Sequence, residues 1–247
     1  MTESILKTIN LNKNFGNLAA LKNVNMEVRR GESRSIIGLN GAGKTTLFNV
    51  ITGFLKPDGG KVIFRGIDIT GRPPYEIVKQ GISRVFQITS IFSKLTVYEN
   101  VAIPFYVRRG IKLSFLSTDH KIKEEVINLL EVLDLKEKKD ELAGNLSYGE
   151  KRRLEIAIAL ATNPILLLLD EPTSGMTSQE SDYIMRYIQN LRKQLGLTVL
   201  LIEHDINIVM KYSDVVMVMH EGSVLAEGTP EEIERDITVQ RIYLGVE

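Results

Sequence analysis

Eight residues near the amino terminus have the types and spacing best suited to binding phosphate. Residues 38–45 read GLNGAGKT, which satisfies the pattern G-x-x-x-x-G-K-[ST]. The glycines let backbone N–H groups converge on phosphate oxygens, Lys44 can reach the β and γ phosphates, and the Thr45 hydroxyl can bind Mg²⁺. The predicted nucleotide-binding residues are therefore Gly38, Leu39, Asn40, Gly41, Ala42, Gly43, Lys44, Thr45 and the adjoining Thr46.

The alternative interpretation of this stretch is a glycine-rich turn with an incidental lysine. The predicted strand SRSIIG, residues 33–38, leads into the motif, and a helical pattern follows it. A phosphate-binding loop requires both neighbours, and the helix adds its positive amino-terminal end. This context favours the phosphate site.

Acidic and imidazole side chains follow two later apolar runs. Asp170 and Glu171 end the run ILLLLDEP, and His204 follows the run TVLLIE. We expect Asp170 to hold Mg²⁺ through water and Glu171 to orient and polarise an attacking water. An Asp-Glu pair at a strand end is, by itself, usually a solvated turn, and a single His is more often structural. Because parallel α/β sheets gather ligands at the carboxyl ends of strands, the phosphate loop favours a functional role for all three.

Short apolar runs alternate with helix-length amphipathic segments along the chain. This alternation is typical of an α/β domain with a largely parallel sheet. Continuous apolar runs this short fit strands that are buried on both faces. The predicted strands cover residues 33–38, 165–170, 198–203 and 214–219.

Between residues 88 and 162 the pattern becomes helical. The stretch KIKEEVINLLEVLDL places apolar side chains on one helical face, and YGEKRRLEIAIALA predicts a further helix. The apolar face of the first helix consists of Ile122, Val126, Leu129, Leu130 and Leu133. We predict a helical subdomain over about 88–162, inserted into a core made of residues 1–87 and 163–247.

Composition excludes several classes of protein. The chain has 247 residues and no cysteine, which argues against a secreted disulfide scaffold and favours the cytosol. Its 31 basic and 31 acidic residues balance, so no nucleic-acid partner is expected. No apolar run is long enough to span a membrane, and MTESILKTIN lacks the pattern of a signal peptide. We expect a soluble chain that can sit on a membrane protein.

Several motifs in a fixed order resemble one family over nearly the whole chain. The phosphate loop, VFQ with Gln87, LSYGE, ILLLLDEPTSG and IEH together resemble the nucleotide-binding subunit of an ATP-binding cassette (ABC) transporter. The resemblance implies an ATPase with a P-loop NTPase (RecA-like) core, an antiparallel β portion near the amino terminus, and ATP and Mg²⁺ as cofactors. It also implies that Gln87 binds Mg²⁺ and senses the water, that His204 contacts the γ phosphate, and that Phe15 stacks on adenine.

In this family the turn that corresponds to LSYGE touches the nucleotide held by a second cassette. The resemblance therefore assigns Ser147, Tyr148, Gly149 and Glu150 to a composite site, and a second ABC ATPase subunit and transmembrane permease subunits become the expected partners. The Ser147 hydroxyl, the open backbone at Gly149 and the helix dipole all suit a phosphate.

The chain departs from the commonest family pattern at Tyr148, Glu150 and Thr177, where glycine, glutamine and Asp or Asn are usual. Because Thr177 stands where Asp or Asn is usual, the sequence does not decide whether this residue makes the usual contact across the dimer. For the basic residues KRR, 151–153, we expect a solvated helix face and not a phosphate or lipid site.

Longer segments indicate the kind of transporter. GLNGAGKTTLFNVITGFLKPDGGKV, LSYGEKRRLEIAIAL and LLIEHDINIVM resemble the ATP-binding subunit of branched-chain amino acid importers, which work at the cytoplasmic face of the membrane. Lipopolysaccharide-export ATPases share the RRxEIA helix and are the nearest alternative. ABC ATPases that act on DNA or the ribosome carry long insertions or two cassettes, and a P-loop kinase would leave LSYGE and His204 without a role.

Apolar residues in a probable loop after Gln87 suggest a contact with the membrane subunit. Ile88, Ile91, Phe92 and Leu95 lack an obvious internal face there, so we predict a groove for a short helix of the permease. The alternative is ordinary packing beneath the helical subdomain.

Overall fold

The larger of two sheets carries the predicted strands. The computed structural model describes residues 3–86, 91–110 and 120–244, and within them this sheet has six strands in the order β10-β9-β3-β8-β7-β6. All neighbours are parallel except β9 and β10. Its strands are β3 (Ser33–Ile37), β6 (Ile82–Val85), β7 (Leu166–Asp170), β8 (Thr198–Ile202), β9 (Val215–His220) and β10 (Ser223–Gly228). The prediction of an α/β fold with a largely parallel sheet is confirmed.

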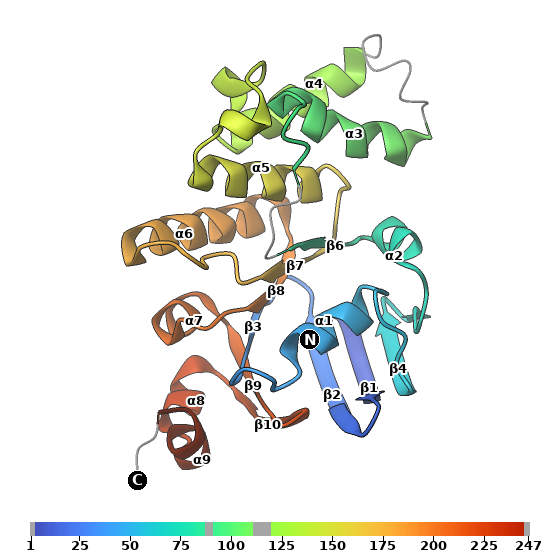
Figure 1. Cartoon of the computed structure of the whole chain (residues 1–247), viewed down its shortest axis with the longest axis vertical. Helices are drawn as coiled ribbons and strands as arrows, with labels where there is room; N and C mark the ends of the chain where they lie inside the picture. Colours follow the sequence, from blue (N-terminus) through green and yellow to red (C-terminus); the bar gives the residue numbers. More distant parts are fainter. Residues whose placement is uncertain (1–2, 87–90, 111–119, 245–247) are drawn as a thin grey trace.

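A smaller antiparallel sheet lies near the amino terminus, as the family resemblance implied. It has the order β2-β1-β4-β5, with β1 (Ser4–Phe15), β2 (Leu18–Arg29), β4 (Gly59–Phe64) and β5 (Ile67–Asp68). Figure 1 shows helix α1 (Lys44–Ile51) between the two sheets. Leu47 and Phe48 of α1 are fully buried in an apolar cluster that also takes side chains from both sheets, so the phosphate loop is anchored from either side.

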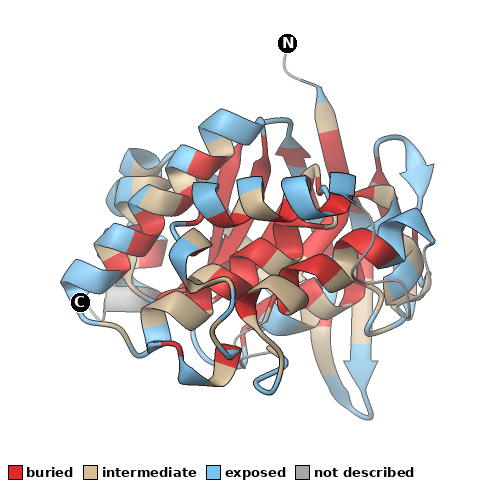
Figure 2. Cartoon of the chain, turned by 90° about the horizontal axis from the view of Figure 1, so that it is seen from above, coloured by how far each residue is buried: buried red, intermediate tan, exposed pale blue. Residues whose placement is uncertain are grey.

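The central strand β7 is apolar over Leu166–Leu169 because both of its faces are covered. In β7, Leu166 and Leu168 belong to the cluster around α1, whereas Leu167 and Leu169 belong to a second cluster on the other face. Side chains alternate between the faces of a strand, so a strand between two cores needs an uninterrupted apolar run. Figure 2 shows these buried strands in the middle of the molecule, with the exposed parts of the helices outside.

Helices α3, α4 and α5 stand together at one end of the molecule (Figure 1). Ile122, Val126 and Leu130 of α4 are buried, as the helical spacing predicts. Their cluster continues into Leu167 and Leu169 of the sheet, so this part of the chain shares its core with one face of β7. The division at about residues 88 and 162 stays a prediction. The helices are α2 (Pro74–Gln80), α3 (Val97–Arg109), α4 (His120–Val132), α5 (Tyr148–Leu160), α6 (Ser178–Leu195), α7 (Ile206–Tyr212), α8 (Pro230–Arg235) and α9 (Ile237–Val239), with short turns at Lys136–Lys138, Ala143–Asn145 and Gln240–Leu244.

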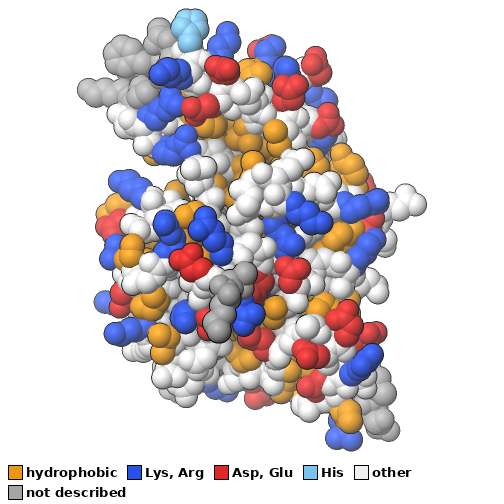
Figure 3. Space-filling model, turned by 180° about the vertical axis from the view of Figure 1, so that it is seen from behind, with side chains coloured by type: hydrophobic (Ala, Val, Ile, Leu, Met, Phe, Trp, Pro, Cys, Tyr) orange, Lys and Arg blue, Asp and Glu red, His pale blue; other side chains and the backbone are white. Residues whose placement is uncertain are grey.

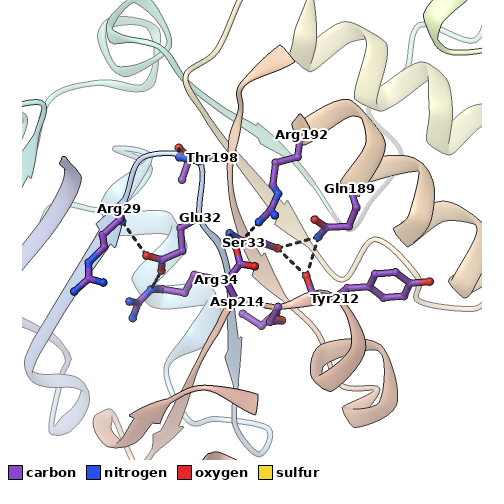
Figure 4. Close-up of polar contacts among 12 residues, drawn as sticks. Arg29, Glu32, Ser33, Arg34, Gln189, Arg192, Thr198, Tyr212 and Asp214 are labelled. Carbon is purple, nitrogen blue, oxygen red and sulfur yellow. Dashed lines mark hydrogen bonds and ion pairs between the residues drawn. The ribbon is translucent and has the colours of Figure 1, made fainter. Parts of the chain in front are cut away.

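A polar network holds the amino ends of the parallel strands (Figure 4). The Ser33 backbone N–H donates to Asp214 Oδ2 at 2.8 Å, and Arg192 Nη1 donates to the same oxygen at 2.5 Å. Gln189 Nε2 donates to Ser33 Oγ at 3.0 Å and to the Tyr212 carbonyl at 2.8 Å. These hydrogen bonds connect helix α6 to the amino ends of β3 and β9. The ligand-binding loops of a parallel sheet follow the opposite, carboxyl ends of its strands.

The surface carries charges of both signs. On the face in Figure 3, Lys and Arg side chains are interspersed with Asp and Glu side chains. Among the described residues, no helix combines the length and the apolar character that crossing a membrane requires.

Candidate nucleotide-binding site

The phosphate loop joins β3 to α1 at the carboxyl edge of the larger sheet. Gly41 and Gly43 have φ angles of 82° and 100°, which side chains rarely tolerate. A Cβ added at Gly43 would also lie 2.5 Å from the Ala20 carbonyl oxygen. Gly43 is the N-cap of α1 and provides no side-chain cap. The first N–H groups of α1 are therefore suited to an anionic ligand.

Lys44 lies where its charge can act on such a ligand. Its ammonium donates to the Gly38 carbonyl at 2.6 Å and to the Leu39 carbonyl at 3.2 Å, and the residue is only 6% exposed. Burial lowers the pKa of Lys44, and the nearby carboxylates of Glu171 and Asp170 partly oppose this shift. Because β3, β8 and β7 are neighbouring parallel strands, the phosphate loop and the predicted acidic pair follow the same edge of the sheet.

A cleft of about 610 Å³ opens over the phosphate loop, which is a volume suited to a nucleotide. Phe15 lines it and is 47% exposed, and the Lys13 ammonium lies 5.7 Å from the centre of its ring. The Thr45 side chain also lines the cleft at the first turn of α1. The complete lining consists of Phe15, Leu18, Ala19, Ala20, Lys22, Gly41, Ala42, Gly43, Lys44, Thr45, Thr46 and Glu221.

Asp170 ends β7 and is buried beside an arginine that the sequence pattern did not single out. Arg84 of β6 donates from Nη2 to Asp170 Oδ2 at 2.5 Å and from Nη1 to Asn49 Oδ1 at 2.6 Å. Its guanidinium also lies 5.5 Å from the ring centre of Phe48 and 4.8 Å from that of Phe86. Arg84, on the neighbouring strand β6, therefore holds Oδ2 of Asp170 in place.

Glu171 and His204 come together from adjacent parallel strands, β7 and β8. His204 Nε2 lies 2.7 Å from Glu171 Oε1. Glu171 has a φ angle of 48°, and its N–H donates to the Ile202 carbonyl at 2.9 Å. The structure thus brings together Lys44, Asp170, Glu171 and His204, whereas Gln87 lies outside the described residues.

Glu203 is a second charged residue that sequence reasoning did not identify. The side chain is 3% exposed, and its Oε1 accepts from the Thr173 N–H at 3.0 Å and from the Thr173 hydroxyl at 2.6 Å. Its Oε2 accepts from the His204 N–H at 3.1 Å. Glu203 therefore links the turn after Glu171 to the backbone of His204. The feature of the sequence that could have identified Glu203 is its position directly after the buried strand β8.

The LSYGE turn, residues 146–150, lies away from the phosphate loop and opens α5. Ser147 is the N-cap of the helix and forms a capping box with Glu150. A Cβ built on Gly149 would meet nothing within 4 Å, so the turn has an open outer side. A cleft of about 330 Å³ borders the turn and shares no lining residue with the cleft over the phosphate loop.

The three departures from the family pattern have local partners. The Tyr148 hydroxyl donates to the Ser174 carbonyl at 2.8 Å, and Thr177 is the N-cap of α6. Glu150 accepts from the Ser147 N–H at 2.8 Å and lies 3.0 Å from the Lys138 ammonium. The carboxylate of Glu150 is therefore compensated within the chain.

The prediction of a solvated face for residues 151–153 is wrong for Arg152. This side chain is 5% exposed and donates to three backbone carbonyls and to Glu155. Arg153 also pairs with the chain, with Nη1 2.8 Å from Asp134 Oδ2. The face was misjudged because α5 packs against the carboxyl ends of β6 and β7, which three consecutive basic letters do not reveal.

Glu150 predicts an acid-dependent contribution to stability. Burial raises its pKa, but hydrogen bonds from Lys138 and Ser147 outweigh that effect and lower the pKa to about 2. A carboxyl group whose pKa falls on folding stabilises the fold above its unfolded pKa, near 4.5, and this contribution is lost as the pH falls toward 2. Glu150→Gln should therefore be less stable than wild type at pH 7, with the difference shrinking below about pH 4.5. Urea unfolding at a series of pH values measures it, and a constant difference down to pH 3 would contradict the assignment.

A phosphate loop opening a helix, with an acidic pair and a histidine at the same edge of a parallel sheet, defines a P-loop nucleotide-binding protein. The family model of ABC transporters matches residues 21–174. This chain belongs to the ABC transporter family.

Three known proteins show how closely the chain follows that family. It is 40% identical over 253 residues to the high-affinity branched-chain amino acid transport ATP-binding protein LivG of Escherichia coli, with 99% of each chain covered. The crystal structure of the ADP conformation of MJ1267, an ATP-binding cassette of an ABC transporter, matches with a TM-score of 0.89 and 37% identity, covering 99% of this chain and 100% of that one. The dimeric cassette MJ0796, in a post-hydrolysis state with ADP and Pi, matches with a TM-score of 0.78 and 30% identity over 92% of this chain and 99% of that one.

Proposed function

We propose that the chain is the ATP-hydrolysing subunit of an ABC importer of branched-chain amino acids. The observation that carries the proposal is the convergence of Lys44, Asp170 and the Glu171–His204 pair at one sheet edge. The likeness to LivG over the whole chain supports the choice of solute. A host strain that lacks the chain should take up labelled leucine, isoleucine and valine more slowly than its parent. Unchanged uptake of all three would contradict the proposed solute.

The described residues have separate tasks in hydrolysis. The N–H groups of the loop and of α1 bind the phosphates, Lys44 pairs with the β and γ phosphates, and Phe15 stacks on adenine. Glu171 accepts a proton from the attacking water as the water approaches the γ phosphorus. His204 orients the Glu171 carboxylate through their 2.7 Å contact, and its proposed second task is to contact the γ phosphate.

Mg²⁺ fits the donor set that surrounds this site. The Thr45 hydroxyl and the Asp170 carboxylate are oxygen donors, and Gln87, outside the described residues, is the third predicted ligand. Among the described residues, no group of three or more His, Cys, Asp or Glu side chains could hold a metal. When bound, Mg²⁺ neutralises charge on the β and γ phosphates.

We propose that two cassettes share each ATP. The LSYGE turn has an open outer side and borders a cleft separate from the phosphate loop, so a second subunit must bring the two features together. Ser147 and the first N–H groups of α5 then face the γ phosphate of the partner. The dimeric form of MJ0796 supports this arrangement, and the partner is either a copy of this chain or a related cassette.

The alternative functions predict different experimental results. A lipopolysaccharide-export ATPase would share the same ATP site, and the uptake experiment separates it from the importer because its loss would leave amino acid uptake unchanged. An ABC ATPase that acts on nucleic acid or the ribosome would not co-purify with a multi-spanning membrane protein. We expect co-purification with permease subunits, at the cytoplasmic face of the membrane.

Phe92 is the best candidate for the permease contact. Of the residues predicted to dock the permease, Ile88 lies outside the described residues, Ile91 packs against the core, and Leu95 is partly buried. The Phe92 side chain is 57% exposed. Phe92→Asp should leave the ATPase activity of the isolated subunit unchanged and reduce uptake by the assembled transporter. Ile237→Asp, at a side chain that is 64% exposed on α9, is the control. Equal loss of both activities in Phe92→Asp would favour packing as its role.

A further inference from the structure

Arg152 lies behind the hydrolytic centre and contacts the backbone of both strands that end there. Its Nη1 donates to the Phe86 carbonyl at 2.9 Å, at the end of β6. Its Nη2 and Nε donate to the carbonyls of Asp170 and Pro172 at 3.3 and 3.1 Å. A single guanidinium therefore joins α5 to the ends of β6 and β7, next to Asp170 and the proposed base Glu171.

The carbonyls of Asp170, the last residue of β7, and of Pro172 flank Glu171 on either side. Glu171 has a left-handed φ of 48°, a conformation that a residue with a side chain keeps only when its surroundings impose it. The Ile202 carbonyl holds the Glu171 N–H, and Arg152 holds the carbonyls before and after the residue. The direction of the Glu171 carboxylate thus depends on the position of the Arg152 guanidinium.

A second interaction fixes the guanidinium itself. Arg152 Nη1 lies 2.7 Å from Glu155 Oε2, one turn along α5, and the two side chains are 5% and 7% exposed. A buried ion pair of this kind often adds little stability compared with an apolar pair, but it fixes a geometry. The planar fork of arginine directs five donors toward acceptors on separate segments, whereas the three donors of a lysine ammonium radiate from a single nitrogen.

We propose that Arg152 is a positioning residue that sets the attack geometry of Glu171. Because Arg152 belongs to the helix that begins at the LSYGE turn, it also passes the position of that turn to the hydrolytic centre of the same subunit. Movement of the turn toward the partner's ATP would then change the position of Glu171 beside this subunit's own ATP. The inference rests on the proposed role of Glu171.

The test separates positioning of Glu171 from binding and from folding. Arg152→Gln and Arg152→Lys are compared with Arg235→Gln, at an exposed arginine on α8. Steady-state ATPase rates, ATP affinity and thermal unfolding are measured for each protein. A displacement of a reacting group by about 1 Å can lower a rate about 100-fold. We expect kcat to fall by about 10- to 100-fold in both Arg152 variants, with KM and ATP affinity within about twofold of wild type.

Each outcome decides the proposal. Arg152→Lys keeps the charge beside Glu155, so a role limited to charge balance or folding predicts wild-type kcat for it, and that result overturns the inference. A rise in KM with unchanged kcat overturns it as well. If Arg152→Gln unfolds, the kcat of Arg152→Lys still decides. If Glu171→Gln hydrolyses ATP at the wild-type rate, the proposed role of Glu171 fails, whereas an inactive Glu171→Gln beside normal Arg152 variants removes only this inference.

Discussion

Glu171→Gln is expected to bind ATP as wild type does and to hydrolyse it more slowly by about 10²- to 10⁴-fold. The amide cannot accept a proton from water, yet it keeps the shape of the carboxylate and can still contact His204, which lies 2.7 Å from Glu171 in the wild type. Lys44 and Thr45 are unchanged, so the phosphates and the metal keep their ligands. Single-turnover hydrolysis tests the expected loss of rate, and equilibrium ATP binding on the same preparation tests the expected unchanged affinity.

Glu231→Gln, on the exposed side of α8, is the matched control for the amide substitution and should hydrolyse ATP at the wild-type rate. A Glu171→Gln protein with a rate within tenfold of wild type would show that another group accepts the proton. Loss of ATP binding in parallel with the rate would instead assign Glu171 to nucleotide binding.

Lys44→Ala is expected to weaken ATP binding by about 10- to 100-fold, because one hydrogen bond to a charged group contributes about 1.5–3 kcal/mol. Lys44 is buried between the loop carbonyls and the acidic pair, so another side chain cannot readily replace its ammonium. Its removal also takes away one of the positive charges that act on Asp170 and Glu171. Titration with Mg-ATP measures the effect.

Lys61→Ala, at an exposed position on β4, controls for the loss of one positive charge and should bind ATP normally. Thermal unfolding of Lys44→Ala shows whether the loop survives the substitution. A stable Lys44→Ala protein that binds Mg-ATP as tightly as wild type would mean that the phosphates bind elsewhere.

The catalytic edge was predictable because its residues follow the most regular elements of the chain. Strands β3, β7 and β8 are buried on both faces, and β7 and β8 are nearly continuous apolar runs with clear ends. Glu171 follows β7 directly, His204 comes shortly after β8, and Lys44 ends the loop that follows β3, so parallel strands place all three at one edge. The helix α4 was predictable for a similar reason, since its buried residues recur at helical spacing.

The supporting charges could not be predicted in this way. The burial of a charged residue depends on which elements pack against it in three dimensions, as it does for Arg84, Arg152 and Glu203. Arg152 follows Lys151 and precedes Arg153 on one helix, and only the packing of α5 against β6 and β7 sets it apart. A local pattern of charge does not contain that information.

The sharing of ATP between two cassettes is tested most directly by the size of Glu171→Gln in solution. Chromatography with Mg-ATP, with ADP and without nucleotide is run on this variant and on two double variants that add Ser147→Arg or Thr238→Arg. Thr238 is exposed on α9, at the opposite end of the molecule from α5 (Figure 1). Because Ser147 caps α5, its replacement costs about 0.5–2 kcal/mol, and unfolding is measured alongside.

We predict that Glu171→Gln and its Thr238→Arg derivative form dimers with Mg-ATP only, and that the Ser147→Arg derivative remains folded and monomeric because a bulky side chain fills the contact. The same runs are repeated with the second cassette of the transporter present. A Glu171→Gln protein that stays monomeric with ATP beside that cassette would contradict the shared site, and so would a Ser147→Arg derivative that dimerises unimpaired.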